Sequence, residues 1–99
     1  MTLQNRIALI TGSSSGIGRA VALAMAAVGA DVVINHPSPR EAATAVDIAE
    51  QIRAMGRRAI PIEADVADEH AVTMMVERIT RELGRIDILV NNAGIAAAA

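Results

Sequence analysis

The residues best suited to chemistry form a glycine- and serine-rich segment, Thr11-Gly12-Ser13-Ser14-Ser15-Gly16-Ile17-Gly18. An apolar run precedes it and a helical pattern follows, so it is expected to join a strand to a helix. Gly12 would allow a sharp turn, Gly16 would let a diphosphate approach backbone N–H groups, and Gly18 would let the helix pack closely on the sheet. The amino end of the helix would attract the anion. The segment predicts a phosphate-binding turn; the alternative is a turn that only begins a helix.

The absence of three residue types excludes several kinds of chemistry. The 99 residues contain no Cys, no Tyr and no Lys, and all nine basic residues are Arg. A thiolate nucleophile, a Schiff-base lysine, a P-loop lysine and a phenolic proton donor are therefore excluded within this sequence. His36 and His70 are far apart, so no metal site is expected.

Composition narrows the class of protein. The sequence is 53% hydrophobic and 20% charged with a net charge of −2, which predicts one globular domain over residues 1–99. Arg and acidic residues are interspersed, so no nucleic-acid surface is expected. No apolar run reaches the roughly 20 residues of a membrane span, so we expect a soluble, cytoplasmic protein with no membrane partner.

Apolar runs alternate with helical patterns along the chain. Strands are expected at 7–10, 32–34, 59–64 and 86–90, and helices begin near residues 16, 40 and 69, each ending at a glycine. Pro61 favours an edge position for the third strand, and Asp68 is a candidate cap for the third helix. Apolar strands alternating with helices predict an α/β fold with a parallel sheet covered on both faces. The expected spatial order of its strands is 3-2-1-4.

The helical patterns also predict which residues face the core. The expected stripes are Ile17, Ala20, Val21, Ala24, Met25 and Val28 on the first helix, Ala45, Ile48, Ala49, Ile52 and Met55 on the second, and Val72, Met75, Val76, Ile79 and Leu83 on the third. Arg57-Arg58 is expected to lie in a solvated turn.

Three motifs together resemble a known family. Thr11-Gly-x-x-x-Gly-Ile-Gly18, Asp65-Val66 after the third strand and Asn91-Asn-Ala-Gly94 after the fourth are similar to those of the short-chain dehydrogenases/reductases. Bacterial glucose dehydrogenases and 3-oxoacyl-carrier-protein reductases are the most similar in character. The resemblance implies a Rossmann-type, doubly wound sheet, an NAD(P) cofactor and transfer of a hydride to or from an alcohol/carbonyl substrate.

The resemblance also implies a set of cofactor-binding residues. The glycine-rich turn would hold the pyrophosphate and ribose, Asp65 and Val66 would line the adenine pocket, and Asn92 with its neighbours would lie along the ribose. Asp65 could instead be a solvated carboxylate or a helix cap, and Asn91 and Asn92 could be turn-formers. The expected cofactor-binding residues are Gly12, Ser14, Ser15, Gly16, Ile17, Gly18, Asn35, His36, Ser38, Asp65, Val66, Asn92, Ala93 and Gly94.

The segment after the second strand indicates the cofactor. An NAD-selective site places an acid there for the ribose 2′-OH, but this chain reads Asn35-His36-Pro37-Ser38-Pro39-Arg40. We therefore predict that NADP(H) is modestly preferred and NAD(H) tolerated, with Ser38, Arg40 and His36 as candidate donors to a 2′-phosphate. Against this, Ser15 and Pro37 stand where NADP-preferring relatives often carry basic residues.

The catalytic residues that the resemblance calls for are missing from these 99 residues. The family uses a Tyr-x-x-x-Lys pair, a Ser and an Asn, and none of these positions is present, so no catalytic residue is assigned. The sequence is interpreted as the cofactor-binding part of an enzyme, inactive by itself, whose full-length form is a homotetramer or homodimer. The alternative is a non-catalytic dinucleotide-binding module. Ala96-Ala97-Ala98-Ala99 could be native sequence or a placeholder for unidentified residues.

Overall fold

The computed structural model describes residues 2–92 and contains four strands and three α-helices in strict alternation. In chain order the elements are β1 (Ile7–Ile10), α1 (Gly16–Ala27), β2 (Asp31–His36), a 3₁₀ turn (Pro39–Glu41), α2 (Ala42–Ala54), β3 (Ala59–Glu63), α3 (Glu69–Leu83) and β4 (Ile88–Val90).

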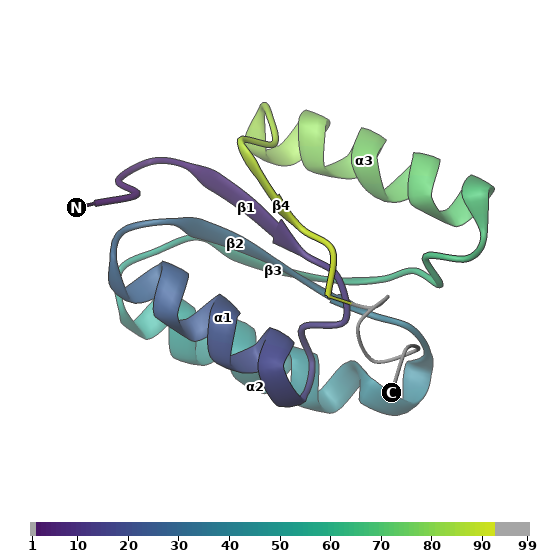
Figure 1. Cartoon of the computed structure of the whole chain (residues 1–99), viewed down its shortest axis with the longest axis horizontal. Helices are drawn as coiled ribbons and strands as arrows, with labels where there is room; N and C mark the ends of the chain where they lie inside the picture. The colour runs from purple at the N-terminus through teal and green to yellow at the C-terminus, as the bar shows by residue number, and fades with distance from the viewer. Residues whose placement is uncertain (1, 93–99) are drawn as a thin grey trace.

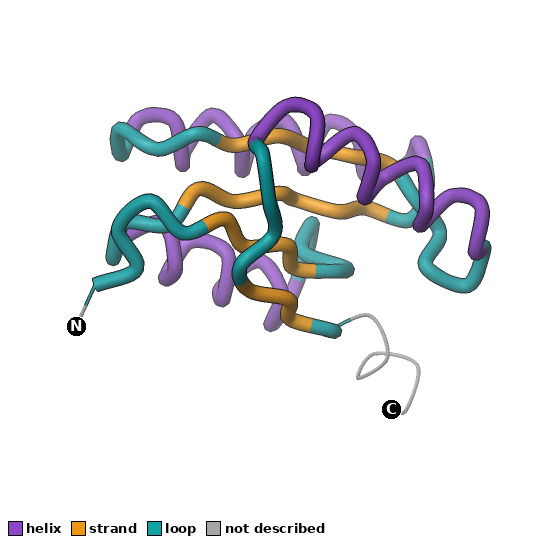
Figure 2. Tube along the Cα trace, turned by 90° about the horizontal axis from the view of Figure 1, so that it is seen from above, coloured by secondary structure: helices purple, strands orange, loops and turns teal. Residues whose placement is uncertain are grey.

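The four strands form one parallel sheet in the order β3-β2-β1-β4. This confirms the predicted order and the edge position of β3, where Pro61 lies. In the register of the sheet, Leu9 is opposite Val33 on one side and Leu89 on the other. The view from above shows the strands running side by side as a single layer (Figure 2).

Helices cover both faces of the sheet. α1 and α2 pack on one face and α3 on the other (Figure 1). Alternate residues of each strand serve the two cores: Ala8 and Ile10 contribute to the core under α1 and α2, while Ile7 and Leu9 contribute to the core under α3. Because β1 is buried on both faces, its sequence is an unbroken apolar run.

The core-facing side of α1 differs from the predicted stripe. The helix buries Gly18, Ala22 and Ala26, spaced four residues apart, while Ile17 and Val28 are 65% and 44% exposed. Small residues at this spacing let the helix axis lie close to the sheet, and the larger side chains are then left at the sides of the contact. The stripes on α2 and α3 follow the prediction, except that Met55 and Val76 are exposed.

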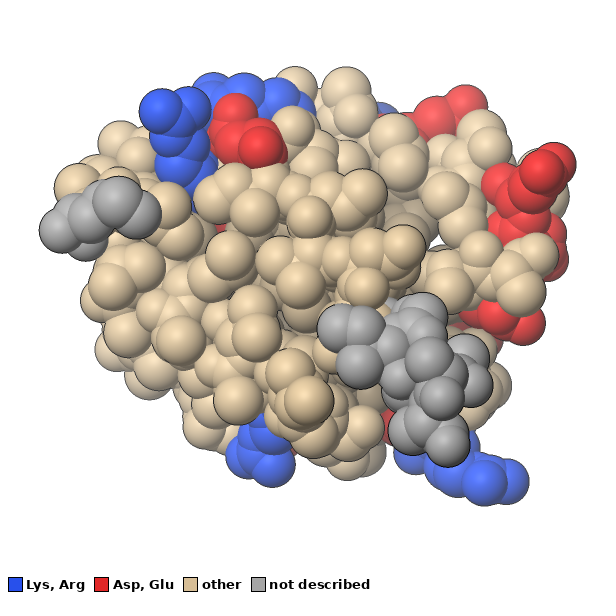
Figure 3. Space-filling view, viewed as in Figure 1, with Lys and Arg blue, Asp and Glu red and all other residues tan. Residues whose placement is uncertain are grey.

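Local boundaries also differ from the sequence prediction. β2 extends to His36, and α2 begins at Ala42 after the separate 3₁₀ turn rather than near Arg40. Asp68 caps α3 as predicted, because its carboxylate accepts from the backbone N–H groups of His70 and Ala71. The centre of the face seen in Figure 3 is largely uncharged, with Arg, Asp and Glu side chains gathered at its periphery.

Candidate cofactor-binding site

The glycine-rich turn leaves the carboxyl end of β1 and leads directly into α1. Gly12 and Gly16 have φ angles of +62° and +57°, a region that side chains other than glycine rarely adopt. Ser15 is the N-cap residue, and the first helical N–H groups, from Gly16 to Gly18, have no acceptor within the helix. The turn therefore presents backbone N–H groups that donate to no acceptor within the helix, at the positive end of the helix dipole.

Gly16 and Gly18 have opposite surroundings. A Cβ on Gly16 would meet no atom within 4 Å, so the space above this residue is open. A Cβ on Gly18 would lie 2.5 Å from the Gly12 carbonyl oxygen and 2.6 Å from the Asn92 side-chain nitrogen. Gly18 is thus required for packing of the turn itself, whereas the open space at Gly16 can admit a ligand next to the backbone.

Two asparagines hold the peptide groups of Gly12 from either side. Asn35 Oδ1 accepts from the Gly12 N–H at 3.0 Å, and Asn92 Nδ2 donates to the Gly12 carbonyl at 3.1 Å. Asn35 lies at the end of β2 and Asn92 follows β4, so the turn is fixed to the strand on each side of β1.

Asn35 connects three segments at once. Its Nδ2 donates to the Ala64 carbonyl at 3.0 Å, and its backbone N–H donates to Ser13 Oγ at 3.0 Å. The Ser13 N–H donates in turn to the Asn35 carbonyl. Asn35 is 1% exposed, so its side chain lies beneath the turn. Both its amide oxygen and its amide nitrogen are bonded to protein atoms. Ser13 and Ser14 are likewise buried, whereas Ser15 is exposed.

The segment after β2 folds back on itself. His36, which is 5% exposed, places Nδ1 2.9 Å from the Ser38 carbonyl oxygen. Because a carbonyl oxygen only accepts, Nδ1 is the donor in this hydrogen bond. The Ser38 hydroxyl donates to Glu41 Oε2 at 2.6 Å. This hydrogen bond, ahead of any other influence, lowers the pKa of the Glu41 carboxyl.

The loop after β3 lies beside this segment, since the Ala64 N–H donates to the His36 carbonyl. Asp65 Oδ1 accepts from the Ala67 N–H at 2.9 Å, which forms a local turn ahead of α3. Val66 is 38% exposed at this edge. Asp65 is therefore a turn-former in this structure, and its contact with adenine stays a prediction.

The structure brings most of the predicted residues to one edge of the sheet, the carboxyl ends of its strands. The glycine-rich turn, Asn35, His36, Asp65 and Asn92 all lie there. Ala93 and Gly94 fall outside the described residues. Glu41 also lies in the segment after β2, although the sequence pattern predicted it only at the start of the second helix. The spacing Ser38-Pro39-Arg40-Glu41, which resembles a pattern typical of helix starts in which serine and glutamate interact, is the sequence signal for its contact with Ser38.

Comparison with known proteins settles the family. Residues 6–99 match the family model described as short chain dehydrogenase. The chain belongs to the short-chain dehydrogenases. It is 44% identical over 88 residues to a 3-oxoacyl-[acyl-carrier-protein] reductase of Staphylococcus aureus, covering 89% of this chain and 35% of that protein.

Solved short-chain dehydrogenase structures share the fold. A short chain dehydrogenase from Burkholderia cenocepacia in complex with NADP superposes with a TM-score of 0.85 at 47% identity, covering 92% of this chain and 36% of that one. A 7α-hydroxysteroid dehydrogenase complexed with NADH superposes with a TM-score of 0.83 at 31% identity, covering 91% and 34%. The chain spans between 35% and 38% of the length of the curated relatives it matches.

No helix within residues 2–92 is long and apolar enough to cross a membrane. No group of three or more His, Asp or Glu side chains there is placed to hold a metal ion.

Proposed function

We propose that this chain binds NADP(H) or NAD(H) and forms the cofactor-binding part of an oxidoreductase acting on an alcohol/carbonyl pair. The single observation that carries the proposal is the open space at Gly16. A left-handed glycine with nothing within 4 Å of its missing Cβ stands at the amino end of a helix. That arrangement suits the close approach of a diphosphate to backbone N–H groups.

Each part of the edge has its own task in this proposal. The N–H groups of the turn, with Ser15 and Ile17, bind the pyrophosphate and ribose, while Asp65 and Val66 line the adenine side. Asn35 and Asn92 act through the turn, because their amides are bonded to Gly12. Ser14, Ala93 and Gly94 stay in the predicted set on the strength of the family motifs.

The bound nicotinamide would supply the hydride chemistry, and the chain's own residues would bind and orient it. The proton that accompanies hydride transfer needs a donor such as the tyrosine and lysine of the family, and neither residue type occurs among these 99 residues. We therefore assign catalysis of proton transfer to residues outside this sequence. We also expect a cytoplasmic homo-oligomer, a tetramer or dimer.

For cofactor choice we propose that NADP(H) is modestly preferred over NAD(H). No carboxylate lies between Asn35 and Arg40, and the relatives include proteins crystallised with either dinucleotide. The test is kcat/KM for both cofactors on the full-length enzyme. A preference for NAD(H) above tenfold, about 1.4 kcal/mol of transition-state stabilisation, would overturn this part of the proposal.

A non-catalytic dinucleotide-binding module is the second candidate, favoured by the lack of Tyr and Lys. Calorimetric titration with NADPH and NADH, followed by an oxidoreductase assay on the full-length protein, separates the two. Binding with turnover supports the enzyme. Binding without turnover of any alcohol or carbonyl compound tested supports the module, and absence of binding overturns both.

A further inference from the structure

The short segment between β2 and α2 folds back on itself, so that the Glu41 carboxylate lies beside Ser38, near the end of β2. His36 is the last residue of β2, and the Ser38 carbonyl, two residues later, accepts from both His36 Nδ1 at 2.9 Å and the Glu41 N–H at 3.2 Å. The Glu41 side chain then accepts from the Ser38 hydroxyl at 2.6 Å. These bonds fold the segment into one compact unit and hold the Glu41 carboxylate beside Ser38.

This location matters if the proposed function holds, because the end of the second strand is where a dinucleotide fold meets the adenosine ribose. NAD(H) offers a 2′-hydroxyl there, which a carboxylate can accept from. NADP(H) offers a phosphate with about two negative charges, which a carboxylate repels. Residues 35–40 contain no acid, but the fold returns Glu41 to the same unit.

We infer that Glu41 is a specificity-determining residue that limits the preference of this chain for NADP(H). It acts in two ways. Its charge opposes a 2′-phosphate, and it occupies the Ser38 hydroxyl, whose single hydrogen cannot be donated to a phosphate at the same time. The neighbouring Arg40, which is exposed, has the opposite charge and favours the phosphate. The modest preference proposed above is the balance of the two.

A purely structural role for Glu41 makes a different prediction. Ser38-x-x-Glu41 with Pro39 at the first position is a pattern found at helix starts, where serine and glutamate fix the first turn. In this structure, however, the Ser38 side chain forms no capping bond to a backbone N–H among the described residues; its hydroxyl bonds to the carboxylate instead. A residue that served only the helix start would affect thermal stability and leave the choice of cofactor unchanged.

The test is Glu41→Gln in the full-length protein, with dissociation constants for NADPH and NADH measured by fluorescence titration. Glutamine keeps an acceptor for the Ser38 hydroxyl but removes the charge. We expect the dissociation constant for NADPH to fall about five- to tenfold and that for NADH to change less than about twofold. At about 0.5 M salt, where the Debye length is roughly 4 Å, the difference between variant and parent should shrink.

Glu50→Gln is the matched control. It removes the same charge from an exposed position roughly 13 Å further along α2, and the ratio of the two dissociation constants should stay that of the parent. An unchanged ratio in Glu41→Gln, or an equal change in Glu50→Gln, overturns the inference while the proposed function stands. Failure of the parent protein to bind either nucleotide overturns the proposed function and this inference with it.

Discussion

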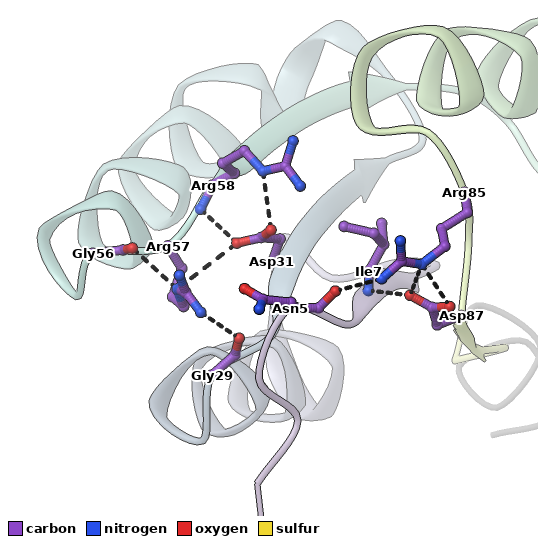
Figure 4. Close-up of polar contacts among 9 residues, drawn as sticks. All are labelled: Asn5, Ile7, Gly29, Asp31, Gly56, Arg57, Arg58, Arg85 and Asp87. Carbon is purple, nitrogen blue, oxygen red and sulfur yellow. Dashed lines mark hydrogen bonds and ion pairs between the residues drawn. The ribbon is translucent and has the colours of Figure 1, made fainter.

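The amino edge of the sheet, where its strands begin, and the carboxyl edge, where they end, are held together by different chemistry. At the amino ends of the strands, Asp31 accepts from the Arg58 backbone N–H at 2.9 Å and pairs with its guanidinium at 3.0 Å, while Asp87 accepts from the Ile7 N–H at 2.8 Å and from Arg85 (Figure 4). At the carboxyl ends, the bonds around the glycine-rich turn join neutral groups, the amides of Asn35 and Asn92 and the Ser13 hydroxyl.

This difference fits the proposed function, in which only the carboxyl edge binds an anion. Asp31 and Asn35 lie four residues apart on β2, both buried, and each ties its end of the strand to neighbouring segments. A carboxylate at position 35 would lie directly beneath the turn and repel a bound anion, whereas an amide can hold the turn without that cost. The amino edge has no such constraint and uses ion pairs.

The sharpest test of this comparison exchanges one open glycine at each edge for valine. Gly16→Val should weaken binding of NADPH at least about a hundredfold, because the side chain fills the space where the phosphate must meet backbone N–H groups. Gly56→Val is the control: Gly56 also has a positive φ and no atom within 4 Å of its Cβ position, but lies between α2 and β3 at the amino edge.

Both valine variants should lose about 1–2 kcal/mol of stability from backbone strain, and only Gly16→Val should lose affinity. Calorimetry for binding and urea unfolding for stability give the two measurements. If Gly16→Val bound NADPH as tightly as the parent, the turn would not be part of the binding site. The proposed difference in function between the two edges would then be wrong.

Asn35→Ala is expected to affect both stability and binding. It leaves the Gly12 N–H and the Ala64 carbonyl without their partner in a fully buried position, at a cost of about 3 kcal/mol in the free energy of unfolding. Because the turn loses its support, the dissociation constant for NADPH should rise about tenfold. A loss of stability with unchanged affinity would mean that the turn keeps its shape without Asn35.

Asp31→Ala is the counterpart at the amino edge. The Arg58 N–H loses its acceptor, but the side chains of Arg57 and Arg58, which both pair with Asp31, can turn toward water. We therefore expect a loss of about 2 kcal/mol in the free energy of unfolding. Affinity for NADPH should stay within about twofold of the parent. A tenfold loss of affinity would show that the two ends of β2 are coupled, contrary to the comparison.

The fold was largely predictable because each strand and most helix faces are encoded locally. Apolar runs and glycine stops predict the four parallel strands, and the doubly wound fold that they indicate supplies the observed order. The face of α1 was mispredicted since the helix is apolar almost all round, and hydrophobicity alone does not reveal that Gly18, Ala22 and Ala26 make the close contact. The predicted stripe begins instead with Ile17, which is exposed.

Long-range polar partners were the harder part of the site and of its opposite edge. Arg57-Arg58 was predicted to be a solvated turn, but both side chains pair with Asp31, more than twenty positions away. The bonds of Asn35 to Gly12 and Ala64 likewise depend on strand order and register together, and its role in cofactor binding stays a prediction. Such contacts require the fold before they can be stated.

The smallest expected effect is the pH dependence of the Asp87 contact. The hydrogen bond from the Ile7 N–H, with help from Arg85, lowers the pKa of the Asp87 carboxyl below its ordinary value of 3.8. A pKa lowered by folding means that the ionised group stabilises the fold above that ordinary value, and that this stabilisation is lost as the pH falls through the lower, folded-state pKa. Asp87→Asn should therefore have a lower Tm than the parent at neutral pH, with a difference that narrows below about pH 4.

Thermal unfolding followed between about pH 3 and pH 7 tests this expectation. Glu82→Gln is the control, since it removes one charge from an exposed ion pair on α3, Arg78–Glu82, which contributes little to stability. Its Tm should stay closer to the parent's than that of Asp87→Asn at neutral pH. A difference for Asp87→Asn that stays constant down to the lowest pH would show that the contact does not depend on the charge of Asp87. The amino edge would then be held, like the carboxyl edge, by hydrogen-bond geometry rather than by ionic attraction.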